Sequence, residues 1–184
     1  MEESKNVIGK FLDPSSILET LNMEKGSVVA DFGCGPGYFS IPIAKVVGEQ
    51  GRVYSLDILP QALETVASKA KNLGILNITT KRVNLEKENG TKLEDGSADW
   101  VILKDILFQN QDKNTIIREA HRVLKNEGRA LVVEWNQKDS TVGPAREIRV
   151  PQVTLEKMFS EHGFIIEKNI DAEDFHYAFV AMKS

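Results

Sequence analysis

Short runs of buried-type residues alternate with longer amphipathic stretches along most of this chain, and that alternation most constrains its fold. The strand-like runs are Ser27–Phe32, Gly51–Asp57, Ile78–Asn84, Ala98–Asp105 and Arg129–Trp135. The helical stretches are Tyr38–Val47, the residues from Pro60 to a stop at Gly74, and Asp112–Lys125, which precedes a turn at Asn126–Gly128. Parallel strands need long crossover connections, which helices provide. The pattern therefore predicts an α/β fold with a mostly parallel sheet and helices on both faces.

The pattern changes after Trp135. Residues 136–151 are polar and contain glycine and proline, so we expect a long loop there. A helix over Val153–Glu161 then leads to two strand-like runs, 164–170 and 175–183. Only four residues separate these two runs, which is too few for a helical crossover, so the runs should pair as an antiparallel hairpin. The sequence thus predicts a seven-stranded, mostly parallel sheet with a reversed last strand.

The bulk properties limit the classes of function. A chain of 184 residues is most simply one domain, so we expect a single domain over 1–184. The formal net charge of -4 and the sequence pI near 5.5 do not favour a nucleic-acid partner. Cys34 is the single cysteine, so we expect no disulfide framework, no cysteine-based metal site and no metal ligand set. No run resembles a signal peptide or a membrane span, which predicts a cytoplasmic protein.

The segment DFGCGPG, Asp31–Gly37, carries the strongest functional signal. It joins a hydrophobic strand to a helix through three glycines, which let a ligand approach the backbone and present helix N-terminal N–H groups to it. A dinucleotide fingerprint would need a glycine where Tyr38 stands, and the lysine of a phosphate-binding loop is absent. Asp31 would repel a pyrophosphate but attract an ammonium group. The turn therefore favours a zwitterionic amino-acid ligand over a phosphate.

A second acid follows in register with this turn. Asp57 ends the second strand-like run, 24 residues after Gly33. A carboxylate at this position can accept hydrogen bonds from both hydroxyls of a ribose. Taken alone the position is a weak signal, because an aspartate at a strand end is often only a helix cap. Together with the glycine turn, Asp57 supports a nucleotide-type site.

These residues resemble the class I, Rossmann-like S-adenosylmethionine-dependent methyltransferases. The resemblance covers nearly the whole chain and rests on VVADFGCGPGYFS, VYSLDI, KRVNLEKE, DWVILKD and REAHRVLKNEGRALVVEW. The chain looks most like the small enzymes akin to the ubiquinone/menaquinone C-methyltransferase and arsenite methyltransferase families. The resemblance implies a Rossmann-like three-layer sandwich, S-adenosyl-L-methionine as the cofactor, and methyl transfer as the activity.

The resemblance also assigns cofactor roles. Asp31 and the glycine backbone would hold the methionine end, Asp57 the ribose, and Ile58 the adenine. Family members usually carry an acid after the third strand, where this chain has Asn84 beside Leu85, and an amide oxygen can still accept a hydrogen bond. Lys104 would face the methyl group through its backbone carbonyl. The implied cofactor-binding set is Asp31, Gly33, Gly35, Gly37, Asp57, Ile58, Asn84, Leu85 and Lys104.

The resemblance leaves the catalytic residues unassigned. Related small methyltransferases often carry a histidine a few residues after the fourth strand, where this chain has Phe108. Asp105, at the end of that strand, and His176 are the remaining candidates. A soft or already anionic nucleophile needs no base, because the sulfonium is itself activated and alignment can carry catalysis. The use of a general base therefore stays open.

The acceptor should lie beyond the carboxyl ends of the strands, past Lys104 and Asp105. The N-terminal cap segment 1–26 and the substrate-side loop 136–151 are available to cover it, and a loop of that length is often a functional lid. The resembling enzymes carry a Gly-Pro-rich, arginine-containing loop and an aromatic/His last strand at these places. We expect a small-molecule acceptor in a pocket lined by Phe108, Glu134, Trp135, Arg149 and His176.

Two other functions remain open. An NAD(P)-dependent oxidoreductase would share the strand-turn-helix and Asp57, but Tyr38 and Asp31 argue against it. A cofactor-binding regulatory or scaffold protein without catalysis would keep the same glycine turn. The sequence defines neither the acceptor nor the atom that is methylated, and it leaves a homodimer open.

Overall fold

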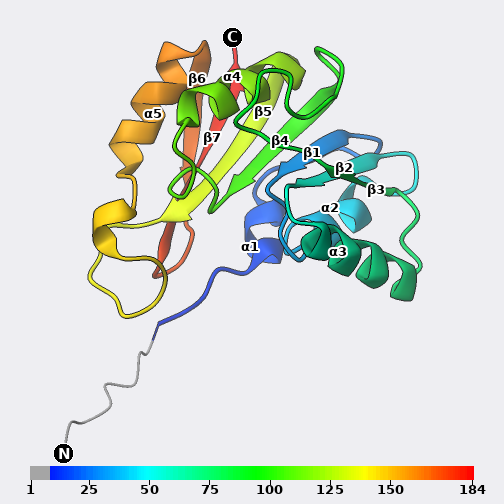
Figure 1. Cartoon of the computed structure of the whole chain (residues 1–184), viewed down its shortest axis with the longest axis horizontal. Coiled ribbons are helices and arrows are strands. Elements are labelled where there is room, and N and C mark those ends of the chain that lie inside the picture. Colours follow the sequence, from blue (N-terminus) through cyan, green and yellow to red (C-terminus); the bar gives the residue numbers. More distant parts are fainter. Residues whose placement is uncertain (1–8) are drawn as a thin grey trace, which may run out of the picture.

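The computed structural model describes residues 9–184, which form a three-layer α/β sandwich (Figure 1). The strands are β1 (Val28–Phe32), β2 (Arg52–Asp57), β3 (Ile78–Arg82), β4 (Ala98–Lys104), β5 (Leu124–Trp135), β6 (Phe164–Ile170) and β7 (His176–Lys183). The helices are α1 (Pro14–Glu19), α2 (Ser40–Val47), α3 (Pro60–Asn72), α4 (Lys113–Val123), the short 3-10 helix η1 (Arg146–Ile148) and α5 (Gln152–Glu161).

The seven strands form one sheet in the order β3-β2-β1-β4-β5-β7-β6. Neighbouring strands are parallel from β3 to β5, whereas β7 runs antiparallel to both β5 and β6. The predicted Rossmann-like fold, with its terminal hairpin and reversed last strand, is confirmed. Because the strand order reverses between β1 and β4, we expect a ligand crevice outside the carboxyl ends of these strands.

Two helical layers cover the sheet. Figure 1 shows α1, α2 and α3 on one side of the sheet and α4 and α5 on the other. In the first layer Ile17 and Ile43 are buried in one apolar cluster with Val29 of β1. In the second, Ile117 and Phe159 are buried in a cluster with strand residues of the opposite face. Apolar residues on both faces of the strands therefore hold the carboxyl ends of the parallel strands at one fixed edge.

Helix α1 lies in the N-terminal segment, where no helix is predicted. The side chain of Asp13 caps it by accepting the N–H of Ser15 at 2.9 Å, and Pro14 occupies the first helical position. The helix buries Ile17 and Leu18. An Asp-Pro start followed by apolar residues is thus a helix signal that periodicity alone does not reveal, because the helix is only 6 residues long.

The predicted turn at 126–128 lies inside β5. The preceding helix α4 ends at Val123, and β5 starts at once with Leu124. The pairing of β4 with β5 shifts register between Ala98 and Trp100, and Glu127 has a φ of 60°. The expected turn is therefore a bulge in a longer strand, since the extra residues are absorbed without ending the strand pairing.

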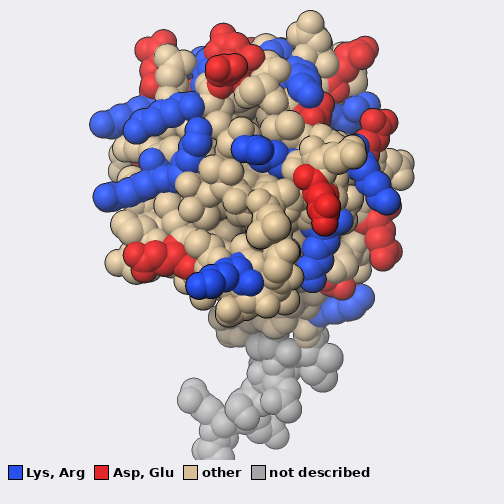
Figure 2. Space-filling model, turned by 90° about the vertical axis from the view of Figure 1, so that its right-hand side faces the viewer, with Lys and Arg blue, Asp and Glu red and all other residues tan. Residues whose placement is uncertain are grey.

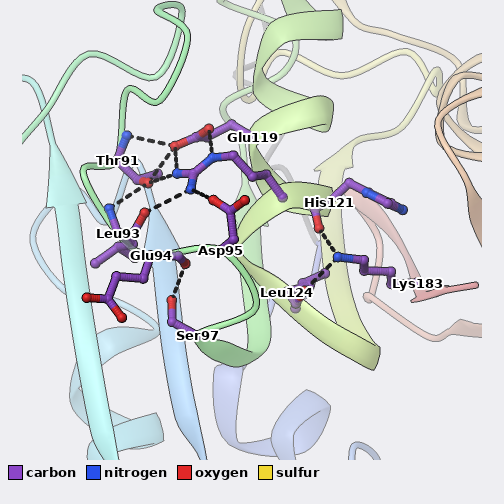
Figure 3. A network of polar contacts seen from close by, with 10 residues as sticks. Thr91, Leu93, Glu94, Asp95, Ser97, Glu119, His121, Leu124 and Lys183 are labelled. Atoms are coloured by element: carbon purple, nitrogen blue, oxygen red, sulfur yellow. Dashed lines mark hydrogen bonds and ion pairs between the residues drawn. The ribbon is translucent and has the colours of Figure 1, made fainter.

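A polar network fixes the connection between β3 and β4 against helix α4 (Figure 3). The buried Glu119 carboxylate accepts the Thr91 N–H at 3.0 Å and the Thr91 hydroxyl at 2.5 Å. The same carboxylate accepts two N–H groups of Arg122 at 2.8 and 2.9 Å. Arg122 also donates to the Leu93 carbonyl at 2.9 Å and pairs with Asp95 at 2.5 Å. Polar contacts thus hold a connection that has no crossover helix.

Figure 2 shows the face of the molecule at the β3 edge of the sheet. Basic and acidic side chains both lie on this face, and neither sign covers it. The face therefore offers no continuous basic surface of the kind that grips a nucleic-acid backbone. Within residues 9–184, no helix combines the length and the apolar character needed to cross a lipid bilayer.

Candidate active site

The glycine turn between β1 and α2 has the backbone that its glycines predict. Gly33, Gly35 and Gly37 have φ values of 67°, 50° and 83°, a region that other residues rarely adopt. A Cβ on Gly33 would lie 2.4 Å from the side chain of Ile106, so the close approach also requires glycine. The N–H groups of Gly33 and Cys34 donate to the carbonyl of Leu56, at 2.8 and 3.0 Å. These bonds tie the turn to the end of β2.

Asp31, near the end of β1, is almost fully buried. Its carboxylate accepts the hydroxyl of Ser40 at 2.6 Å, and the hydroxyl of Ser55 donates to Ser40 at 2.7 Å. Burial raises the pKa of Asp31 to about 6, despite the hydrogen bond from Ser40. Asp31 also lines the cleft described below. The chain thus holds one dry carboxylate beside the glycine turn, where an ammonium group would be its natural partner.

Asp57 ends β2 and points back to the glycine turn. Its two carboxylate oxygens accept the N–H of Gly35 and the N–H of Leu59, each at 2.9 Å. These bonds fix the orientation of the carboxylate at a strand end. Each oxygen keeps acceptor capacity, so the fixed carboxylate can still accept two hydroxyl groups from a ligand.

A cleft of about 480 Å³ opens at the carboxyl ends of β1, β2 and β4. Of the cofactor residues predicted from the sequence, eight line this cleft: Asp31, Gly33, Gly35, Asp57, Ile58, Asn84, Leu85 and Lys104. Gly37 lies outside its lining, and a Cβ there would sit 3.0 Å from Val66 of α3. The space at Gly37 is therefore limited by helix α3 rather than by a ligand.

The cleft also includes residues that sequence reasoning missed. Tyr38, Phe39, Val83, Ile106, Gln109 and Asn110 are among them. Three of these six come from the segment after β4, where Ile106 packs on Gly33. A pattern of strands and helices gives no signal for this contact. Asn84, at the position of the usual family acid, accepts the N–H of Glu86 at 3.0 Å and so also stabilises its own turn.

Lys104 and Asp105 form the wall of the cleft at the end of β4. The Lys104 ammonium pairs with the Asp105 carboxylate and lies 5.6 Å from the centre of the Tyr38 ring. Asp105 has a φ of 53°, which is uncommon for a residue other than glycine. Nε2 of His176 lies 3.2 Å from one Asp105 oxygen and 3.3 Å from the other. The two residues considered as catalytic candidates are therefore in direct contact.

The residues predicted to line the acceptor pocket are a second set, outside the cleft. Trp135 and His176 are register partners on β5 and β7, and their tilted rings are in contact, with centroids 4.2 Å apart. Phe108, which follows β4, is half-buried. The 480 Å³ cleft is lined by none of the five predicted acceptor residues: Phe108, Glu134, Trp135, Arg149 and His176. Asp105 lines that cleft and contacts His176, so it joins the two groups of residues.

Arg149 is buried within the loop it belongs to. Its guanidinium donates to the backbone carbonyls of Pro144, Asn136, Lys138 and Val142, at 2.9 to 3.1 Å. These four bonds use four of the five guanidinium N–H groups within the 136–151 loop. Arg149 therefore organises that loop in this structure, and its side chain points toward backbone rather than into the cleft.

Glu134, at the end of β5, is completely buried. One carboxyl oxygen accepts the N–H of Leu107 at 2.6 Å. Burial, followed by the nearby negative charge of Asp105, raises the pKa of Glu134 to about 8. At neutral pH this carboxyl is therefore mostly protonated, and it fixes the backbone just after Asp105.

Comparison with known proteins places this chain in a family. A profile of the methyltransferase domain matches residues 23–178. The ubiquinone/menaquinone biosynthesis C-methyltransferase of Haemophilus ducreyi is 33% identical over 121 residues, 65% of this chain and 46% of that protein. The demethylmenaquinone methyltransferase of Geobacillus stearothermophilus is 32% identical over 123 residues, 66% of this chain and 50% of that protein. The chain thus spans about half the length of these curated relatives.

Solved structures support the same fold. A SAM-dependent methyltransferase from Aquifex aeolicus matches with a TM-score of 0.86 and 21% identity, covering 95% of this chain and 91% of that one. An arsenic(III) S-adenosylmethionine methyltransferase from Chlamydomonas reinhardtii matches with a TM-score of 0.69 and 23% identity, covering 87% and 64%. The family resemblance inferred from the motifs is confirmed. The chain belongs to the methyltransferase domain family, and its fold is that of the solved S-adenosylmethionine-dependent methyltransferases.

Proposed function

We propose that this chain binds S-adenosylmethionine in the 480 Å³ cleft and transfers its methyl group to a small-molecule acceptor. The observation that carries the proposal is the pair of fixed carboxylates, Asp31 and Asp57, on either side of the glycine turn. Asp31 suits an ammonium group and Asp57 suits a ribose diol. A ligand with both groups is what this arrangement recognises.

The other cofactor residues take roles along the same cleft. The backbone of Gly33 and Gly35 would face the amino-acid end, and Ile58 and Leu85 would pack on the adenine, with Asn84 near its amino group. The exposed Ile58 side chain offers an apolar surface for that packing. When bound, S-adenosylmethionine would supply a methyl group already activated by its positive sulfur.

The acceptor would approach past Lys104 and Asp105. Phe108, Glu134, Trp135, Arg149 and His176 would form its surroundings, either by contact or, for Arg149, by holding the 136–151 loop. Relatives that act on quinone precursors make a planar small molecule a reasonable first acceptor class. Cys34 is buried and free, which fits a reducing compartment such as the cytoplasm.

Calorimetric titration tests cofactor binding. We expect the protein to bind S-adenosylmethionine and S-adenosylhomocysteine and not to bind NAD(P). Replacing Asp57 with Ala should weaken binding by about 1.5–3 kcal/mol, because the ribose loses a charged acceptor. Glu161→Gln, an exposed substitution on α5, is the matched control and should bind like the natural protein. Equal affinity in a folded Asp57→Ala variant would contradict ribose recognition by this residue.

Methyl transfer is tested separately with radiolabelled S-adenosylmethionine. The acceptors offered are small molecules, metalloids, protein and RNA, and we expect label only in small molecules. Label in protein or RNA would overturn the acceptor class. Tight cofactor binding with no labelled product from any class would instead favour a binding protein without catalysis.

A further inference from the structure

Three buried polar atoms lie next to the cleft without a hydrogen-bond partner among residues 9–184. They are Oδ1 of Asp105, Oε2 of Glu134 and Nδ1 of His176. Nε2 of His176 approaches the Asp105 oxygen within 3.2 Å, but without full hydrogen-bond geometry. Buried polar atoms are nearly always paired, because leaving them unpaired is costly. The Asp105 and His176 side chains are in direct contact, and the charge of Asp105 acts on Glu134 from the end of β4. The unpaired atoms therefore belong to a polar site around Asp105 rather than to isolated packing defects.

The three residues come from three strands that meet at one edge of the sheet. Asp105 follows β4, Glu134 lies near the end of β5, and His176 begins the antiparallel β7. The His176 side chain is 4% exposed and the Asp105 side chain 17%. Asp105 therefore faces the cleft, and His176 lies behind it, with its ring packed at a tilt against Trp135.

The backbone around Asp105 is held from two sides. The Asp105 N–H donates to the Val133 carbonyl at 2.9 Å, and the Leu107 N–H donates to Glu134 at 2.6 Å. These bonds flank the left-handed φ of 53° at Asp105. Uncommon backbone angles persist where the surroundings over-determine them, and such positions cluster at functional sites. The carboxylate is thus presented to the cleft in a fixed orientation.

We propose that Asp105 is the catalytic proton acceptor and that His176 is its positioning residue. The proposal rests on the function proposed above and narrows its substrate class. The acceptor would be a small molecule whose methylated atom carries a hydrogen, as a hydroxyl or an activated C–H. Lys104, paired with the same carboxylate, places a positive charge where the acceptor would become negative.

The step balances as a simple displacement. The acceptor atom forms a bond to the methyl carbon, and the electron pair of the broken carbon–sulfur bond stays on sulfur. The proton of the acceptor passes to the Asp105 carboxylate and then to solvent. No oxidant or other reactant is needed. Catalytic bases are commonly oriented by a second side chain. Here the imidazole of His176 would orient the carboxylate, and the carboxylate would face the substrate.

The structural alternative is that Lys104, Asp105 and His176 are only a charge network at a strand end. A matched pair of acceptors separates the two roles. 2-Naphthol needs a base at neutral pH, whereas 2-naphthalenethiol has the same shape and ionises far more readily. A residue that accepts the proton should matter for the first probe and much less for the second.

The experiment measures methyl transfer and binding for the natural protein and three variants. Asp105→Asn should lower kcat for 2-naphthol by about 100-fold or more, the usual share of a general base. The rate with 2-naphthalenethiol and the dissociation constants of 2-naphthol and S-adenosylhomocysteine, from calorimetry, should stay within about threefold. Asp105→Glu keeps a carboxylate and should retain part of the rate. Glu161→Gln, an exposed acid on α5 away from the cleft, is the control.

His176 is tested by rescue. His176→Ala should lower kcat for 2-naphthol by about tenfold with little change in KM, because the carboxylate loses its orientation. His176→Gln should recover part of this loss, since its amide can donate to Asp105. A merely structural role would lower both probes equally and show no rescue.

Several results would overturn the proposal. One is an equal loss of rate with 2-naphthol and 2-naphthalenethiol in Asp105→Asn. Another is that Asp105→Asn mainly weakens the binding of 2-naphthol. The third is that the natural protein methylates the thiol and not 2-naphthol. A protein that binds S-adenosylhomocysteine but gives no product from 2-naphthol would overturn the substrate class and leave the cofactor site intact. Absence of cofactor binding would overturn the proposed function itself, and the proton acceptor with it.

Discussion

Two aspartates flank the glycine turn, and their surroundings give them different properties. Asp57 accepts two backbone N–H groups at a strand end. Asp31 accepts the Ser40 hydroxyl in a dry environment, and burial raises its pKa to about 6. The same side chain therefore orients two backbone N–H groups in one place and is a buried charge in the other. The difference depends on burial, which the sequence motif does not contain.

Cofactor affinity should consequently fall in weak acid. Asp31 carries its charge above pH 6 and loses it as the pH falls through about 6, while the ligand's ammonium stays protonated. Below that pH, the affinity should drop by up to about tenfold per pH unit. Protonating Asp31 before the ligand binds costs about 1.4 kcal/mol of binding free energy for each pH unit below the pKa. Calorimetric titration from pH 7.5 to 5 would measure it.

Asp31→Asn is the matched variant. It should bind weakly at pH 7.5 and show little further change down to pH 5. The groups nearest to Asp31 that could add a pH effect are Asp57 and Lys104, which this variant retains. A variant with the natural protein's pH profile would assign the effect to one of these groups instead.

The residues that line the candidate cofactor cleft could mostly be predicted from the sequence, but the contacts on the acceptor side could not. Asp31, Asp57 and the glycines lie within short motifs whose geometry is local. The contact of Asp105 with His176 joins residues 71 positions apart. It depends on the antiparallel register that pairs Trp135 with His176. Sequence reasoning placed both residues near the methyl group but could not show that they touch.

At the scale of elements, the 136–151 loop owes its shape to one side chain. The sequence predicts that Arg149 faces the acceptor, whereas its guanidinium donates to four carbonyls of its own loop. The loop has little regular structure beyond the three residues of η1, so side chains, Arg149 above all, satisfy much of its backbone. A guanidinium carries five N–H donors in a fixed plane, so it can donate to several backbone carbonyls at once.

Arg149→Ala should therefore destabilise the protein as well as disturb methyl transfer. Losing bonds from a charged donor and leaving buried carbonyls unpaired should cost about 2–4 kcal/mol in the free energy of unfolding. Arg146→Ala, in the same loop, breaks only an exposed pair with Asp139 and should cost less than about 1 kcal/mol. Urea unfolding of both variants would measure the difference. Equal costs would show that the loop does not depend on Arg149.

The misplaced elements have local causes. Periodicity predicts long amphipathic helices well, but α1 has 6 residues and shows itself only through Asp13 and Pro14 at its start. The Asn-Glu-Gly run at 126–128 has the composition of a turn, and the structure uses it as a bulge within β5. Whether such a run ends a strand or forms a bulge in it depends on how the strand pairs with β4, and three residues of local sequence do not specify that pairing.

At the scale of the molecule, the fold brings distant residues to one edge of the sheet. The carboxyl ends of β1, β2 and β4 supply the cleft, and β5 and β7 supply the polar cluster behind Asp105. Asp105 lies between them because β4 is central in the sheet order. The reversed strand β7 matters here, since its first residue, rather than its last, reaches this edge. The order of strands thus determines which side chains can act together.

The buried acid Glu134 should also make the free energy of unfolding of the whole protein depend on pH. Glu134 has a pKa of about 8 in the folded protein, raised first by burial and then by Asp105, against an ordinary value of 4.5. Between these two values the folded protein holds a proton that the unfolded chain has released. Stability therefore falls as the pH rises from 4.5 to about 8 and is unaffected by this group above that range.

Glu134→Gln isolates this contribution. Glutamine resembles the protonated acid, and its oxygen can still accept the Leu107 N–H. The free energy of unfolding of the variant minus that of the natural protein should therefore rise by about 1 kcal/mol per pH unit between pH 5 and 8. Urea titrations of both proteins would measure this difference. Glu161→Gln, which changes an exposed acid, should show no such trend. A constant difference between Glu134→Gln and the natural protein across this range would mean that Glu134 is ionised in the folded state, with Lys104 as the nearby positive charge able to stabilise it.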